Sequence, residues 1–241
     1  MTASSRYAGV SMQRRDFLAA LAASCAAPCI APAEVLAAIP SNGKRRLYSR
    51  ALLTDSAGRP LRAATLAAER NYIFHYPYVT TPCFLLDLGQ PARAPADSAW
   101  PGGVGPKQSL VAYSAICSHK LTYPTREISF ISYRSAASPQ NRHARVIHCC
   151  SEHSQYDPAR GAQVLTGPAP HPLAAILLEH DPKADALYAI GTYGTEMFDA
   201  FFDKFAFRLA MENGAQGVRK LTGSEVRVSE LDSFCRQQVR C

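Results

Sequence analysis

The chain has few of the features that mark nucleic-acid-binding, repeat or membrane-spanning proteins. Its 241 residues contain no internal repeat and no block of like charge, although the formal net charge is +7. No stretch interleaves Lys or Arg with aromatic residues, which argues against a nucleic-acid partner. There is no nucleophile–base motif, phosphate loop or mononuclear iron triad. With 47% hydrophobic and 19% charged residues, the chain is predicted to be a soluble globular protein.

The N-terminal stretch "SMQRRDFLAALAASCAAPCIAPAEVLAAIP" contains the pair Arg14–Arg15 followed by an alanine-rich run. It resembles a twin-arginine export signal covering residues 1–38, which predicts a periplasmic protein. A short amphipathic helix start is the alternative. Two prolines and a glutamate interrupt the run, so it is a poor spanning helix, and membrane attachment is expected only if this segment is retained.

The number of cysteines does not decide whether they are free thiols or form disulfides. Loss of residues 1–38 would leave six cysteines: Cys83, Cys117, Cys149, Cys150, Cys235 and Cys241. An even number of cysteines in an oxidising compartment is typical of disulfide-bonded proteins. Cys235 and Cys241 are close enough in sequence to pair with each other.

Short strand-like runs dominate residues 62–192, with glycine and proline between them. The predicted strands are 71–77, 83–89, 108–115, 128–134, 144–149, 174–180 and 186–191, the last two forming a hairpin with its turn at 181–185. This pattern predicts an all-β domain, an antiparallel sandwich or barrel. Residues 39–61 are mixed and rich in proline and arginine, so we expect a linker there.

The pattern changes in residues 193–241. Apolar residues recur at helical spacing at Phe198, Phe202, Phe205 and Leu209. A C-terminal helix is therefore predicted, with Thr195 as its N-cap and Gly214 as its end. The helix either packs on the sheet or docks a partner subunit, since Met197 and Phe201 widen its apolar face. Residues 215–241 are expected to be loosely ordered.

Two Cys/His pairs are the candidate metal ligands of the chain. Cys117-x-His119 follows one predicted strand, and Cys150-x-x-His153 follows another. Two thiolates on one iron and two imidazoles on the other suit a [2Fe–2S] cluster. Cys150 is chosen over Cys149 because only Cys150 lies at this spacing from a histidine, and Cys149 is expected to face the opposite way. A structural zinc site with the same residues, or scattered core residues with disulfides, are the alternatives.

These motifs resemble the Rieske iron–sulfur family over residues 62–192. "GPAP" at 167–170 is similar to the family's proline loop, so Gly167, Pro168 and Pro170 are expected to cover the cluster. "SQYD" at 154–157 is similar to the Ser-x-Tyr pair of high-potential members. The resemblance implies that Ser154 donates a hydrogen bond to a bridging sulfide and that Tyr156 donates one to a ligand sulfur, which raises the reduction potential.

Within the family, the stretches "FHYPYVTTPCFLLDLG" and "GGVGPKQSLVAYSAICSHK" are most similar to the small Rieske subunit of arsenite oxidase. This implies an exported electron-transfer subunit with no substrate chemistry of its own, paired with a molybdopterin-type catalytic subunit and passing electrons to an acceptor such as a c-type cytochrome. A quinol-oxidising Rieske subunit, an oxygenase ferredoxin and a zinc-stabilised binding module are the rival interpretations.

Three departures from the family pattern bear on these expectations. The disulfide that joins the two cluster loops in many relatives is absent, because its positions are Thr122 and Glu152 here. The second loop is one residue shorter than usual between His153 and Tyr156. The insertion between the two motifs and the C-terminal helix are also unusual.

Overall fold

The computed structural model describes residues 44–96, 98–139 and 141–241. The predicted export signal at 1–38 lies outside these residues. Within them, the largest element is an eight-stranded sheet in the order β12–β1–β11–β10–β4–β3–β2–β13. Its strands are β1 Lys44–Thr54, β2 Tyr72–His75, β3 Pro82–Asp87, β4 Leu110–Ser114, β10 Ala175–Asp181, β11 Ala186–Gly194, β12 Glu225–Arg227 and β13 Ser229–Glu230.

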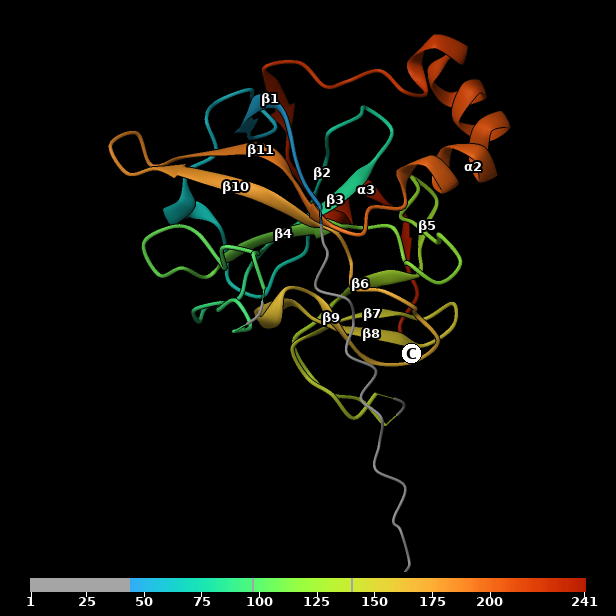
Figure 1. Cartoon of the computed structure of the whole chain (residues 1–241), viewed down its shortest axis with the longest axis horizontal. Helices are drawn as coiled ribbons and strands as arrows, with labels where there is room; N and C mark the ends of the chain where they lie inside the picture. The colour runs from blue at the N-terminus through green and yellow to red at the C-terminus, as the bar shows by residue number, and fades with distance from the viewer. Residues whose placement is uncertain (1–43, 97, 140) are drawn as a thin grey trace, which may run out of the picture. The chain divides into compact units, whose positions relative to one another are not determined.

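This sheet curves back on itself into a near-closed barrel. The strands at its two ends, β12 and β13, are separated in the chain by Val228 alone. The long antiparallel hairpin of β10 and β11 extends from one side of the barrel, as Figure 1 shows, and Asp181 pairs with Ala186 at its turn. The predicted all-β fold and the predicted hairpin are both confirmed.

A smaller antiparallel sheet is inserted between β4 and β10. It has the order β6–β7–β8–β9 and consists of β6 Ile131–Arg134, β7 Val146–Cys149, β8 Ser154–Asp157 and β9 Gln163–Thr166. Next to it, β5 Ile128–Ser129 pairs in parallel with β14 Gln237–Gln238 near the C-terminus. In Figure 1 the smaller sheet lies below the barrel, so the insertion forms a separate layer.

Strand β3 separates two hydrophobic cores because it is buried on both faces. Phe84 and Leu86 pack in a cluster with residues of the smaller sheet, such as Ile131 and Ile147. Their neighbour Leu85 belongs instead to the core inside the barrel. A central strand buried in this way is typically a continuous apolar run, which "PCFLL" at 82–86 is.

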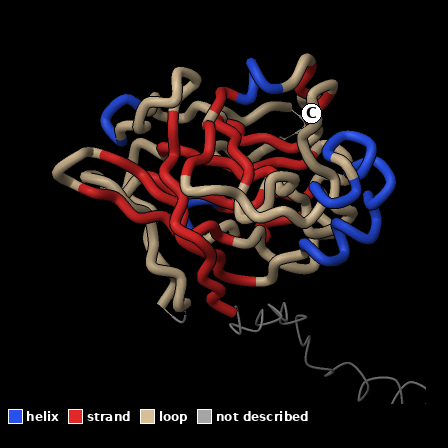
Figure 2. The backbone as a smooth tube through the Cα atoms, turned by 90° about the horizontal axis from the view of Figure 1, so that it is seen from above, coloured by secondary structure: helices blue, strands red, loops and turns tan. Residues whose placement is uncertain are grey.

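Two expectations about the ends of the domain are wrong. The predicted linker 39–61 contains β1, which pairs with β11 and β12 in the barrel. Residues 215–241, expected to be loosely ordered, contain β12, β13, β14 and the short helix α3 Leu231–Phe234. Figure 2 shows that strands make up the body of the molecule and that helical turns lie toward its edges. Single turns of 3-10 helix occur at Ala63–Thr65, Pro158–Arg160 and Ala215–Gly217.

The predicted C-terminal helix is present as α2 Phe198–Asn213, and it ends at Gly214 as expected. Its N-cap is Met197 without a side-chain cap, so the assignment of Thr195 is wrong. Phe198, Phe201 and Phe202 pack against the loop that follows β4 rather than against the sheet face. No helix in the described part of the chain is long and apolar enough to span a membrane.

Candidate functional site

The first predicted motif lies in a tight loop after β4, which we call loop one, residues 116–123. The Cys117 N–H donates to the Thr122 carbonyl at 2.8 Å, and the Leu121 N–H donates to the Cys117 carbonyl at 2.9 Å. Leu121 has a positive φ of 59°. These bonds close the loop, so that the Cys117 side chain is buried while His119 is half-buried.

The second motif lies in the connection between β7 and β8, which we call loop two, residues 149–154. The loop is closed by the pairing of Cys149 with Ser154 at its two ends. His153 is exposed and has a positive φ of 59°. In loop two, therefore, Cys149 is buried in the core and His153 is exposed to solvent.

The structure brings the sulfur atoms of Cys117 and Cys149 together beneath the two loops. The Cys149 thiol hydrogen-bonds the Cys117 sulfur, and this bond is the largest cause of a lowered pKa at Cys117. The pKa of Cys149 is raised by the same bond and by burial. The two sulfurs thus form a buried pair, and cysteines bind metals as thiolates.

A phenol completes the surroundings of Cys117. The Tyr156 hydroxyl lies 3.2 Å from the Cys117 sulfur and also accepts a hydrogen bond from the Ser118 N–H at 3.3 Å. Burial and the nearby Cys117 raise the pKa of Tyr156, so the phenol stays protonated and can donate to the sulfur. The short spacing in loop two does not prevent the predicted contact between Tyr156 and a cysteine.

Among the buried polar atoms without a partner in the described residues are Nδ1 of His119 in loop one and Oγ of Ser154 in loop two. Buried polar atoms of native proteins nearly always have a hydrogen-bond or metal partner. Both atoms belong to residues that the sequence assigns to the metal site, so a bound group would satisfy them.

The structure places Cys150 away from this site. Its sulfur is bonded to Cys241 in a disulfide with a Cα–Cα distance of 5.7 Å. The orientation predicted for Cys149 and Cys150 is therefore wrong. Side chains alternate along β7, so Ile147 and Cys149 share the buried core face. His148 and Cys150 therefore point to the opposite side. The predicted Cys235–Cys241 disulfide is also wrong, since Cys235 is a free, buried thiol.

A His/Cys group lies on that other side. Donor atoms of His148, Cys150 and Cys241 lie within 4.8 Å of one another. Burial, the His153 ring and Arg134 lower the pKa of His148 to about 4, so its imidazole is neutral at pH 7. The rings of His148 and His153 have centroids 5.8 Å apart. Because both sulfurs of this group are bonded to each other, it offers only its imidazole to a metal.

A single ion pair joins the two loops directly. Lys120 of loop one lies 2.8 Å from Glu152 of loop two, at the edge where the family disulfide would lie. The ammonium group of Lys120 lowers the pKa of the Glu152 carboxyl. This ion pair is exposed to solvent, so its contribution to stability is small.

The predicted covering segment 167–170 packs against loop two. Gly167 has a φ of 93°, and a Cβ atom there would lie 2.6 Å from the Ser154 Cα and 2.7 Å from the His153 carbonyl oxygen. Only glycine fits this close approach. One residue after the segment, the His171 carbonyl accepts a hydrogen bond from the Ser118 hydroxyl of loop one at 2.6 Å. Pro168 and Pro170 are exposed on its outer side.

Comparison with known proteins gives one finding of note. No protein-family profile matches the chain. The chain is similar to the soluble domain of Rieske protein II (SoxF) from Sulfolobus acidocaldarius, with 32% sequence identity. The match covers 53% of this chain and 72% of that one, and the TM-score is 0.40.

Proposed function

The chain belongs to the Rieske protein family, and on this premise we propose that it holds a [2Fe–2S] cluster and carries single electrons. The observation that carries the proposal is the buried pair of Cys117 and Cys149. Backbone N–H groups two and three positions after each cysteine donate to its sulfur, those of His119 and Lys120 to Cys117 and those of Ser151 and Glu152 to Cys149. Donors to sulfur favour thiolates and suit iron ligation.

The donor set that we propose differs from the sequence-based set in one position. Cys117 and Cys149, rather than Cys117 and Cys150, would supply the thiolates, and His119 and His153 would supply the imidazoles. The unpartnered Nδ1 of His119 and Oγ of Ser154 fit a cluster lying between the loops. Such a cluster, when bound, takes up and releases one electron.

The surrounding residues would set the potential and the access to solvent. The Tyr156 hydroxyl donates to the Cys117 sulfur, which favours the reduced state because that state carries more negative charge. The segment 167–170 excludes water from one side of the loops. His153, which is exposed, lies where a redox partner can approach. The chain's own role is therefore electron transfer, with substrate chemistry left to a partner.

We place the protein in the periplasm, between a catalytic oxidoreductase subunit of the molybdopterin type and an acceptor such as a c-type cytochrome. The twin-arginine pattern at 1–38 and the resemblance to the small subunit of arsenite oxidase support this assignment.

The test is metal and sulfide analysis of the purified full chain, together with an EPR-monitored redox titration. We expect iron and sulfide in equal amounts and a rhombic signal of low average g-value in the reduced protein. Cys149→Ser should abolish both. Cys150→Ser, its neighbour and matched control, should keep the signal.

The reverse result for the two variants would make Cys150 the ligand. Zinc in place of iron would remove the electron-transfer function and favour a zinc-stabilised binding module. A signal that titrates only at clearly negative potential would keep the cluster but remove the proposed role of Tyr156.

A further inference from the structure

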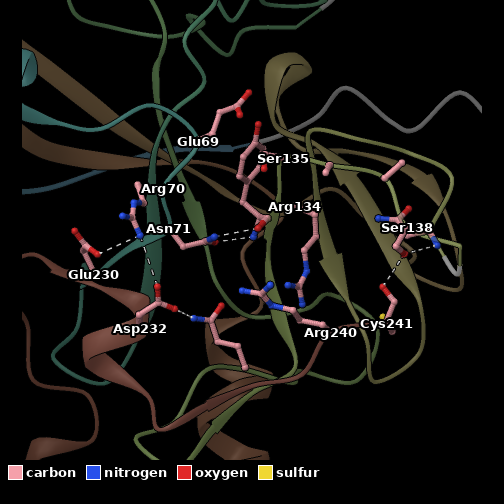
Figure 3. Close-up of a pocket in the computed structure, with 15 residues that line it drawn as sticks. Glu69, Arg70, Asn71, Arg134, Ser135, Ser138, Glu230, Asp232, Arg240 and Cys241 are labelled. Carbon is pink, nitrogen blue, oxygen red and sulfur yellow. Dashed lines mark hydrogen bonds and ion pairs between the residues drawn. The ribbon is translucent and has the colours of Figure 1, made fainter.

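A polar cavity of about 350 Å³ lies away from the cysteine site. It is enclosed by the end of β6 with the loop that follows it, by residues 69–71, and by the C-terminal segment 238–241. Figure 3 shows that Arg134 and Arg240 extend toward one another here, from two segments far apart in the sequence. We call this cavity the arginine pocket.

The acidic residues of the arginine pocket are already paired. Arg70 lies 3.8 Å from Glu230 and 3.9 Å from Asp232. Glu69 is paired with Arg145 at 3.1 Å. Each of these three carboxylates therefore has an arginine partner other than the two that extend into the pocket, although Glu230 and Asp232 share Arg70.

Arg134 and Arg240 are not neutralised in this way. Neither has a carboxylate within ion-pair distance in the part of the chain that the structure describes. Arg134 is half-buried, one of its terminal nitrogens donates to the Val239 carbonyl, and its Nε is buried without a partner. Burial and then the charge of Arg240 lower the pKa of Arg134. The half-buried guanidinium of Arg134 is therefore held beside a second positive charge, which is unfavourable unless an anion lies with them.

We infer that the arginine pocket binds a small oxyanion, such as inorganic phosphate or sulfate, through Arg134 and Arg240. A guanidinium group presents its N–H donors in a planar fork that matches two oxygen atoms of such an anion. The unpartnered Nε of Arg134 supplies a donor that no protein group uses. The cavity is large enough for the anion together with water.

The bound anion also connects two parts of the chain. Arg134 is the last residue of β6, and Arg240 is next to Cys241, which is bonded to Cys150 of loop two. An anion held by both arginines would tie the C-terminal segment to the smaller sheet. Because it binds the folded state only, it should raise the melting temperature progressively, with the logarithm of its concentration once the site is largely occupied.

The experiment is calorimetric titration of inorganic phosphate into the full chain, with ionic strength held constant by sodium chloride. We expect saturable binding and a rise in melting temperature that chloride alone does not give. Arg240→Gln should raise the Kd about tenfold or more, the loss expected for one charge-assisted hydrogen bond. Its side chain is exposed, so this variant is expected to fold. Arg134→Gln should have the same effect.

Arg70→Gln is the matched control. Arg70 lines the same pocket, but its charge is already engaged by Glu230 and Asp232. This variant should therefore change the Kd less than about twofold. Equal heats for phosphate and chloride, or an unchanged Kd in Arg240→Gln, would overturn the inference. Equal weakening in all three variants would also overturn it, because it would reveal attraction by net charge alone.

Discussion

Loop one and loop two present their cysteines in the same way but are held in place by different parts of the chain. In each loop, the backbone N–H groups two and three positions after the cysteine point at its sulfur. This local geometry follows from the tight turn itself. Beyond the turn, the direct links between side chains of the two loops among the residues described are the contact of Cys117 with Cys149 and the ion pair between Lys120 and Glu152.

Helix α2 supports loop one. The rings of Phe201 and Phe205 each lie 4.9 Å from the ring of Tyr123, in edge-to-face arrangements. The Lys204 ammonium donates to the Lys120 carbonyl at 2.6 Å. The predicted apolar face of the helix is therefore used within the chain, against the loop that carries Cys117.

Loop two is supported by the C-terminal segment instead. The disulfide between Cys150 and Cys241 fixes its first residues, and the Arg134 side chain holds the same segment through Val239. The family disulfide between the loops is missing, since Thr122 and Glu152 stand at its positions. Residues 193–241 therefore hold each loop separately, by packing for loop one and by a covalent bond for loop two.

The largest effect is expected from breaking the support of loop one. Phe201 is fully buried, so Phe201→Ala should lower the free energy of unfolding by about 3–5 kcal/mol. Amide hydrogen exchange should become faster in residues 118–122 before it does so in loop two. Urea unfolding and exchange measurements check this. Phe207→Ala is the control, because Phe207 is on the same helix and 80% exposed, and a similar loss in that variant would contradict the assigned packing.

A smaller loss of stability should follow from removing the disulfide that supports loop two. Cys241→Ser removes the disulfide and should lower the free energy of unfolding by about 2–4 kcal/mol. Faster exchange should appear in loop two and β14, while loop one keeps its protection. The double variant with Cys150→Ser should add little to the single one, because both remove the same bond. Additive losses would show that the two thiols act independently and that the disulfide does not form.

The sequence predicted the strands well but predicted their distant partners poorly. Runs such as 83–89 and 186–191 were recognisable because alternation and apolar content are local properties. Strand β1 was missed because "KRRLYSR" is polar, and its place in the sheet depends on pairing with β11, about 140 residues away.

The same limit explains the error at the site. Spacing to His153 favoured Cys150, but the side on which each cysteine lies depends on the register of β7 and on Cys241, which is 91 residues away. The expected contact of Tyr156 with a cysteine is present, at Cys117. The buried orientation of Cys149 could have been found by extending the alternation from Ile147.

The smallest expected effect comes from a substitution that acts on one cysteine sulfur and leaves the support of both loops in place. The Tyr156 hydroxyl contacts Cys117 and not Cys149, so Tyr156→Phe removes one donor from one thiolate. A hydrogen bond to a charged group contributes about 1.5 kcal/mol, which corresponds to a fall in reduction potential of about 60 mV for one electron. An EPR-monitored titration of the variant measures it. Tyr123→Phe is the matched control, because its hydroxyl has no partner in the described structure and no contact with either cysteine. Equal shifts in both variants would mean that the potential responds to the general polarity of the loops, and that the phenol does not tune Cys117 in particular.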